Sequence, residues 1–270
     1  MPNIDELLKA TPLPAVEARL LMMRVLNKTR IQLITQSDYQ LSDSEYKQFA
    51  ELEQRRSKGV PVAYLIGQRE FFGLNFHVTP DVLIPRPDTE LLVELAIQYA
   101  PPNAHVLDLG TGSGAIAITL AKQRPDLQVW ACDLSAAALA VARHNAQSHG
   151  CMVQFLESDW YSQLPQMHWH TIVANPPYIE QHDPHLKQGD LRFEPLNALT
   201  DHADGLSAYR QIISGAKSRL TNDGWLLVEH GYDQAEAVRK LFAAHAFNHI
   251  QSWRDIAEIE RVSGASAKEY

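Results

Sequence analysis

The chain has 270 residues, of which 45% are hydrophobic and 21% charged, a composition typical of a soluble globular protein with a sizeable core. The formal net charge of -8 argues against general affinity for nucleic acid, because a phosphate backbone binds basic surfaces. No apolar run approaches the roughly 20 residues that span a membrane, and the first residues do not resemble a signal peptide. Cys132 and Cys151 lack metal-site spacing and are too few for a disulfide framework. We therefore expect reduced thiols in a cytoplasmic protein, with no metal site and no membrane partner.

Helical signals dominate the chain up to about residue 60. Ser42 and Glu45 have the spacing of a capping box, which predicts a helix that starts there and ends near Gly59. Residues 15–26 have a second helical pattern. This part of the chain carries no paired acids, metal-ligand cluster or nucleophile. We predict a small helical domain over residues 1–65 that recognises substrate and takes no part in the chemistry.

A different pattern occupies residues 66–87. Within it, residues 70–78 have the pattern of two short strands around Gly73. Three prolines then favour extended backbone and oppose a helix: Pro80, Pro85 and Pro87. We predict that residues 66–87 form a β-hairpin linker between two domains.

Strand and helix patterns alternate from residue 88 to residue 270. Asp88 is expected to cap a helix that extends to about Tyr99. Strands are expected at residues 106–109, 127–132, 153–156, 171–174, 225–229 and 249–253. This alternation predicts an α/β catalytic domain with a parallel sheet and helices on both faces.

A glycine-rich loop follows the first strand of this domain and precedes a helix. It consists of Gly110, Thr111, Gly112, Ser113 and Gly114. Backbone N–H groups and the helix N-terminus are expected to face a ligand there. Asp133, at the end of the next strand, can accept hydrogen bonds from both hydroxyls of a ribose, and Trp160, together with Asp159, follows the third strand and can meet an adenine ring.

An adenosine cofactor without a 2′-phosphate fits this arrangement, and both NAD and S-adenosylmethionine qualify. The glycine spacing differs from the dinucleotide pattern G-x-G-x-x-G. In addition, the site at the end of the fourth strand, residues 175–178, has no obvious acid or base for hydride chemistry. Both observations favour S-adenosylmethionine.

The tetrapeptide Asn175-Pro176-Pro177-Tyr178 directly follows the apolar strand at residues 171–174. Two prolines end a strand and stiffen the loop after it, at the edge where open α/β sheets bind ligands. The Asn175 side-chain carbonyl and the Pro176 backbone carbonyl can accept the two hydrogens of a planar NH2 group, while the Tyr178 ring stacks on it. We predict that Asn175, Pro176 and Tyr178 are catalytic and that Pro177 completes the substrate site. The irregular residues 180–204 are expected to form a substrate-binding loop.

The glycine loop after Asp108 and Leu109, together with the tetrapeptide, resembles class I S-adenosylmethionine-dependent amino-methyltransferases. Residues 79–90, with the sequence TPDVLIPRPDTE, indicate a narrower family within this class. They are similar to the HemK/PrmC family, the peptide chain release factor N5-glutamine methyltransferases. Three further segments are also similar to that family: residues 61–67, 193–195 and 204–206. The resemblance covers residues 55 to 230.

This resemblance implies a Rossmann-like seven-stranded sheet with a small N-terminal helical domain and a β-hairpin linker. It implies methylation of the glutamine N5 atom in the Gly-Gly-Gln motif of class I release factors, a reaction of translation termination. S-adenosylmethionine would be the cofactor and S-adenosylhomocysteine the product. Gly110 to Gly114, Asp133, Trp160 and Asn175 would line the cofactor site, and Asn175 to Tyr178 would hold the glutamine amide.

Two other function classes compete with this interpretation. An amino-methyltransferase that acts on DNA or RNA could use the same tetrapeptide on the exocyclic amine of a flipped base. The acidic net charge and the absence of a basic stripe count against it, so no nucleic-acid partner is expected. A non-catalytic module that binds an adenosine nucleotide would have no use for the tetrapeptide.

Overall fold

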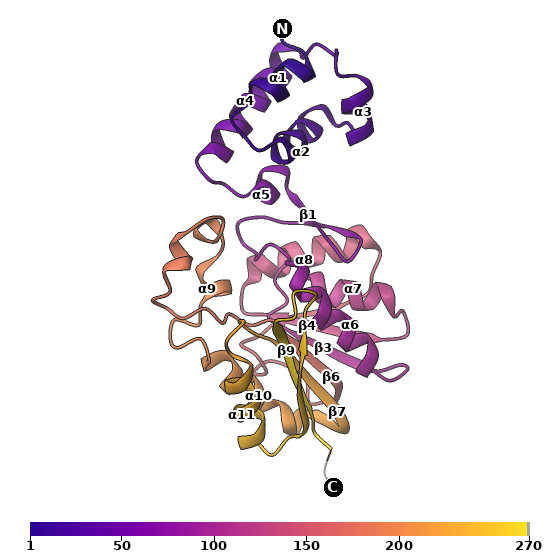
Figure 1. The fold of residues 1–270 in the computed structure, drawn as a ribbon. Coiled ribbons are helices and arrows are strands. Elements are labelled where there is room, and N and C mark those ends of the chain that lie inside the picture. The colour runs from indigo at the N-terminus through magenta and orange to yellow at the C-terminus, as the bar shows by residue number, and fades with distance from the viewer. Residues whose placement is uncertain (269–270) are drawn as a thin grey trace. The chain divides into compact units, whose positions relative to one another are not determined.

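The computed structural model describes residues 1–268, which form two compact units. We call residues 1–68 together with residues 188–193 the helical unit, and the other described residues the sheet unit. The short segment 188–193 thus belongs to the helical unit, although its neighbours in sequence on both sides belong to the sheet unit. Figure 1 traces the chain through both units by colour.

Helices build the helical unit. They are α1 (Ile4–Ala10), α2 (Ala15–Leu26), α3 (Arg30–Thr35), α4 (Asp43–Ser57) and α5 (Val62–Ile66). The predicted capping box is present, since the Ser42 hydroxyl accepts from the Glu45 N–H and the Glu45 carboxylate accepts from the Ser42 N–H. The helices enclose an apolar core that includes Leu21, Met22 and Phe49.

The sheet unit alternates strands and helices after an initial hairpin. The hairpin strands are β1 (Gln68–Phe71) and β2 (Leu74–His77), of which β1 begins with the last residue of the helical unit. The other strands are β3 (His105–Leu109), β4 (Gln128–Asp133), β5 (Gln154–Glu157), β6 (Trp169–Ala174), β7 (Leu220–Glu229), β8 (Asn248–Arg254) and β9 (Glu260–Ser266). The helices are α6 (Glu90–Tyr99), α7 (Ala115–Gln123), α8 (Ala136–His149), α9 (Leu196–Leu199), α10 (Ser207–Ala216) and α11 (Ala235–Ala244).

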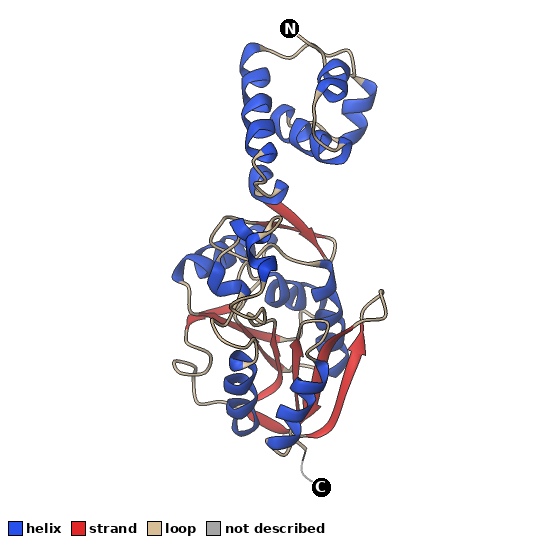
Figure 2. Cartoon of the chain, turned by 60° about the vertical axis from the view of Figure 1, so that its left-hand side comes forward, coloured by secondary structure: helices blue, strands red, loops and turns tan. Residues whose placement is uncertain are grey.

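The large sheet has seven strands in the order β5-β4-β3-β6-β7-β9-β8, which confirms the α/β class and the seven-stranded fold. Its core strands are covered on both faces. Residues of α6, α7 and α8 form one core cluster with one face of the sheet, and residues of α10 and α11 form another with the opposite face. Figure 2 shows these helices in blue around the red strands. Alternate residues of each strand therefore contribute to different cores.

Two expectations are wrong. The sheet is mixed and not parallel throughout, because β9 lies antiparallel between β7 and β8. A tight turn at Asp255, where the Asp255 N–H donates to the Ile259 carbonyl, joins β8 to β9 and leaves no room for the crossover that parallel strands need. The strand β9 was missed because its small residues, such as Ser263 and Gly264, give a weak strand pattern. Asp88 does not cap α6, which instead follows a 3-10 turn at Pro87–Thr89 and has no side-chain cap.

Candidate active site

The predicted site residues follow three neighbouring strands at one edge of the sheet. β3 has β4 on one side and β6 on the other, all parallel, with Leu109 opposite both Cys132 and Ala174. The chain leaves β3 toward β4 and later returns to the other side of β3 with β6, so the strand order reverses there. Ligands of open α/β sheets bind at such a switch point, outside the carboxyl ends of the strands.

The glycine loop is tied to the next strand by its backbone. The N–H groups of Gly110 and Thr111 both donate to the Cys132 carbonyl at 2.9 Å. The Gly112 N–H donates to Asp133 Oδ2 at 2.8 Å, and the Ser135 N–H donates to Asp133 Oδ1 at 2.9 Å. Asp133 is thus not the N-cap of α8, whose cap is Ser135.

The environment of Asp133 suits a cofactor that carries a ribose. Burial raises the pKa of this carboxyl, and the donated N–H groups oppose the shift. A carboxylate accepts about four hydrogen bonds, so Asp133 keeps acceptor capacity beyond its bonds to Gly112 and Ser135. The residues present therefore fit an adenosine group placed against the loop.

Trp160 lies against the start of the glycine loop. A methyl group at Gly110 would lie 3.6 Å from the Trp160 ring, so the ring lies close to Gly110 at the end of β3. The Cys132 thiol donates to the Trp160 carbonyl, with 3.4 Å between sulfur and oxygen. Asp159, by contrast, is exposed. The structure brings Trp160 together with Gly110, and its contact with adenine stays a prediction.

Asp108 lies beneath the loop as a fully buried carboxyl. The Thr111 hydroxyl donates to its Oδ2 at 2.6 Å, whereas Oδ1 has no hydrogen-bond partner among the described residues. Burial raises the pKa of Asp108 to about 7, and the Thr111 bond opposes this. Asp108 thereby fixes the loop from below.

The tetrapeptide leaves the end of β6 and is held from several sides. Pro176 is buried, while Asn175 and Tyr178 are half-buried. The Asn175 Nδ2 donates to the Thr89 hydroxyl at 3.2 Å. The Tyr178 carbonyl accepts from Gln234 Nε2 at 2.9 Å. Both anchors come from elsewhere in the chain, so the stiffness of the loop has a tertiary origin beyond its two prolines.

Four residues near the tetrapeptide were not singled out from the sequence: Thr89, Gly205, Glu229 and Gln234. Thr89 and Gly205 lie in segments that the family resemblance covers, but nothing local in the sequence indicates a contact with the tetrapeptide. For Glu229, the sequence offered one signal: a carboxylate at the end of an apolar strand, where burial of a charge is costly. Gln234 precedes α11 and carries no such signal.

Other features of the sheet unit bear on its chemistry. Both cysteines are free, and burial raises the pKa of Cys132 to about 12, so this thiol stays protonated at neutral pH. Among residues 1–268, no three His, Cys, Asp or Glu side chains form a group that could hold a metal ion. None of the helices within these residues combines the length and the apolar character that crossing a bilayer requires.

Comparisons with known proteins agree with this geometry. The profile of the PrmC N-terminal domain matches residues 4–67, and that of the methyltransferase small domain matches residues 87–190. The release factor glutamine methyltransferase of Burkholderia pseudomallei is 53% identical over 96% of this chain and 94% of its own. That of Escherichia coli is 42% identical over 95% and 93%. A methyltransferase structure from Pyrococcus furiosus, at 12% identity, shares the fold with a TM-score of 0.58 over 82% of this chain and all of its own.

The seven-stranded sheet and the glycine loop with its acidic partner define a class I methyltransferase. With relatives of this similarity over nearly its whole length, the chain belongs to the release factor glutamine methyltransferases.

Proposed function

We propose that this enzyme transfers a methyl group from S-adenosylmethionine to N5 of the glutamine in the Gly-Gly-Gln motif of class I peptide chain release factors. The names of its relatives support the substrate. One observation carries the site assignment: the Asn175 amide is held by Thr89 at the end of β6, on the strand next to the glycine loop. A methyl donor on that loop and an acceptor amide at Asn175 would be neighbours.

The cofactor would lie against the glycine loop, with Gly110 to Gly114, Asp133, Trp160 and Asn175 as its binding residues. When bound, S-adenosylmethionine supplies a methyl group already activated by its sulfonium charge. Asp133 would hold the ribose through the acceptor capacity left over from Gly112 and Ser135. Trp160, close to Gly110, would flank the adenine.

The tetrapeptide would hold the glutamine amide. An amide nitrogen is a poor nucleophile, because its lone pair is shared with the carbonyl, so alignment with the methyl group matters most. Asn175 Oδ1 and the Pro176 carbonyl would accept its two hydrogens and stabilise the positive charge that grows on nitrogen. Tyr178 would stack on the amide plane. Proton loss can follow methyl transfer, so no residue is assigned as a base.

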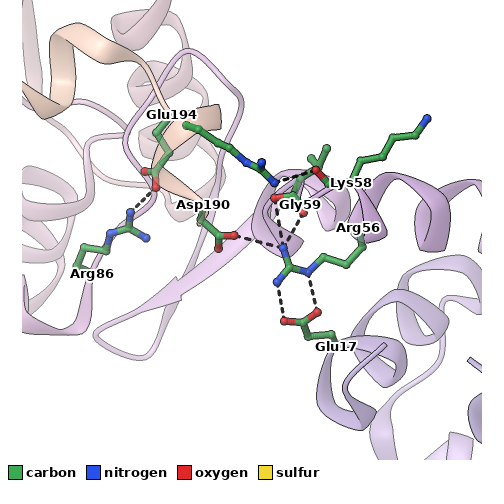
Figure 3. Close-up of polar contacts among 9 residues, drawn as sticks. Glu17, Arg56, Lys58, Gly59, Arg86, Asp190 and Glu194 are labelled. Atoms are coloured by element: carbon green, nitrogen blue, oxygen red, sulfur yellow. Dashed lines mark hydrogen bonds and ion pairs between the residues drawn. The ribbon is translucent and has the colours of Figure 1, made fainter. Parts of the chain in front are cut away.

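The helical unit would recognise the release factor outside the reacting glutamine. Residues 180–204 would form a substrate loop, since they follow the tetrapeptide directly. Their inner segment, 188–193, belongs to the helical unit. The Arg56 guanidinium pairs there with both Glu17 and Asp190 (Figure 3). This pairing supports a role for the inner segment in the recognition proposed for the helical unit.

Asn175→Ala tests the proposal. We expect a loss of ~10²–10³ in kcat, by analogy with other preorganised electrostatic groups, with little change in melting temperature. The loss should lie in kcat more than in KM, because the acceptor dipole matters most as nitrogen becomes positive. The measurement is steady-state methylation of a release factor with labelled S-adenosylmethionine. A folded Asn175→Ala enzyme with near-normal kcat would refute the amide-binding role.

Tyr178 variants are a matched control for the same loop. If the ring supplies only a stacking face, Tyr178→Phe keeps most of the activity and Tyr178→Ala loses much of it. A purely structural role for the loop predicts instead that both changes act through the melting temperature. Labelled transfer to DNA or RNA, but not to release factor, would favour the nucleic-acid alternative.

A further inference from the structure

Asn175 and Glu229 lie side by side at the ends of adjacent strands. β6 and β7 run parallel with Val173 opposite Leu227; two residues further along, Glu229 is the last residue of β7 and Asn175 directly follows the end of β6. Residues two apart on a strand face the same side of the sheet. Val173 and Leu227 both belong to the core cluster that contains α6. Asn175 and Glu229 therefore face the side of the sheet that α6 covers.

Thr89 reaches the same place from the start of α6. It is buried, and its Oγ1 accepts from Asn175 Nδ2 at 3.2 Å. The Thr89 hydroxyl hydrogen is then left for another acceptor. Burial raises the pKa of the Glu229 carboxyl to about 7, and the nearby Thr89 and Asn175 side chains act to lower it. Three side chains from distant parts of the chain thus meet at the end of β6.

The Glu229 carboxyl is an acceptor that its surroundings do not saturate. Only 2% of the residue is exposed, and its Oε2 has no hydrogen-bond partner among the described residues. An ionised carboxylate can only accept hydrogen bonds. A neighbouring amide therefore has lower energy with its NH2 end turned toward the carboxylate than with its oxygen there.

The preference of the Glu229 carboxylate for the NH2 end decides which end of the Asn175 amide faces outward. With Nδ2 turned to Thr89, and with Glu229 beside it, Oδ1 is left on the opposite end of the amide. A half-turn of the same amide would present NH2 to the NH2 of a glutamine, donor against donor. An asparagine without these neighbours would have no reason to prefer the productive orientation.

We propose that Thr89 and Glu229 are positioning residues that orient the Asn175 amide, so that its oxygen accepts from the NH2 group of the substrate glutamine. The inference rests on the proposed function and deepens it. Neither residue touches the reacting atoms in this account. Both act through Asn175, and removing either should slow transfer while leaving cofactor binding intact.

The first test compares Thr89→Val with Thr89→Ser. Thr89→Val is nearly isosteric but lacks the hydroxyl, and we expect kcat to fall about ten- to hundred-fold, as for other small misplacements of a reacting group. KM and the Kd for S-adenosylmethionine should stay near their original values. Thr89→Ser should restore most of the lost activity. The control is Thr171→Val, which removes another buried threonine hydroxyl, one without a hydrogen-bond partner among residues 1–268, and should leave kcat unchanged.

The second test exchanges the Asn175 amide and the Glu229 carboxylate. Asn175→Asp keeps acceptor oxygens for the substrate but places a carboxylate beside Glu229, so we expect a severe loss of activity. Glu229→Gln in the same chain supplies an NH2 group to the new carboxylate. The double variant Asn175→Asp/Glu229→Gln should therefore exceed Asn175→Asp in kcat by about ten-fold or more, whereas Glu229→Gln by itself should lower kcat.

The third test is the pH profile of kcat. If the ionised Glu229 carboxylate orients Asn175, kcat should rise with pH through the region near 7 and this limb should vanish in Glu229→Gln. Asp88 raises and Arg261 lowers the pKa of Glu229, and the nearby Tyr178 and Tyr209 stay protonated because burial raises their pKa values. Asp108 also has a pKa of about 7. A limb that survives Glu229→Gln would belong to such a group and would count against the inference.

The outcomes separate this inference from the function on which it rests. If Asn175→Ala is inactive while folded Thr89→Val and Glu229→Gln keep kcat within about two-fold, the positioning role is refuted and the proposed function stands. If Asn175→Ala itself is active on release factor, the proposed function fails first. A double variant no better than Asn175→Asp would also refute the orientation of the amide by Glu229.

Discussion

At the scale of single residues, Gly205 shows how closely the tetrapeptide is packed. Its backbone has a φ of +75°, and a methyl group there would lie 2.5 Å from the Tyr178 carbonyl oxygen and 2.9 Å from Gln234 Nε2. The Gln234 amide donates to the carbonyls of both Tyr178 and Gly205. A side chain at this position would therefore displace the bond that holds Tyr178.

We predict that Gly205→Ala lowers kcat on release factor by about ten-fold or more, because small displacements of a binding group are costly. Affinity for S-adenosylmethionine should change little, and calorimetry can check it. Gly73→Ala is the matched control, since Gly73 also has a positive φ of +75° but no atom lies within 4 Å of the added methyl group. Equal effects of the two changes would trace the loss to backbone strain and not to the Tyr178 contact.

Asp133 should prove important for cofactor binding in two ways. Asp133→Ala removes the proposed bonds to the ribose and also the bond to the Gly112 N–H. Bonds to a charged acceptor contribute roughly 1.5–3 kcal/mol each, so the Kd for S-adenosylmethionine should rise ten-fold or more. Asp133→Asn, which keeps one carbonyl acceptor, should lose less. Unchanged affinity in a folded Asp133→Ala enzyme would remove this residue from the site.

At the scale of elements, the loop between the tetrapeptide and α10 contributes residues to each unit. At its base, the Ile179 N–H donates to the Leu199 carbonyl and the Gln181 N–H to the Ala203 carbonyl. Its inner segment joins the helical unit through Asp190, which pairs with Arg56 at 3.2 Å. The loop is therefore ordered by contacts that its irregular sequence does not reveal.

Glu194 is the first residue of the sheet unit after the segment 188–193, and its buried carboxylate forms an ion pair. This carboxylate pairs with the Arg86 guanidinium (Figure 3). The Glu194 side chain is 0% exposed and also accepts from the Ile84 N–H. Residues 84–86 belong to the linker segment and Glu194 to the loop, two of the segments in which the sequence resembles its family. The pair thus joins two stretches that are about a hundred residues apart in the chain.

Arg86→Met should destabilise the sheet unit, because the Glu194 carboxylate would stay buried without its guanidinium. Removing one partner of a buried pair costs about 3–5 kcal/mol, and the one-third exposure of Arg86 places the expected loss below that range. The urea midpoint should report it. The double variant Arg86→Met/Glu194→Gln should recover part of the stability. A urea midpoint unchanged by Arg86→Met would contradict a stabilising role for the pair.

At the scale of the whole molecule, truncation can test whether the helical unit recognises substrate while the sheet unit binds the cofactor. A chain that starts at Pro61 lacks helices α1 to α4 and also the partners of the segment 188–193, including Arg56. We predict that it binds S-adenosylmethionine like the full chain but methylates intact release factor at least about ten-fold more slowly, since the contacts proposed for recognition are gone.

A short Gly-Gly-Gln peptide provides the control for this truncation. If the helical unit only recognises the release factor, the truncated and full chains should methylate the peptide at similar rates. Full activity of the truncated chain on intact release factor would refute the recognition role. Equal losses on both substrates would show that the helical unit supports the active site itself.

The sequence by itself determined the features that depend on neighbours in the chain. The capping box at Ser42, the glycine loop and the stiff tetrapeptide after an apolar strand each follow from short-range sterics and hydrogen bonding. The positions of the glycine loop and Asn175 at one sheet edge follow from the alternation of strands and helices. Together with the family resemblance, these local patterns were enough to predict the fold class and the candidate site.

Only the tertiary structure decided which residues surround that site. Thr89 meets Asn175 across 86 positions of sequence, and Glu229 joins them because β7 pairs with β6. The same holds for β9, whose small residues form a strand because β7 and β8 flank it, and for residues 188–193, which belong to the helical unit. Such contacts depend on strand pairing and helix packing over long separations, and no local propensity encodes them.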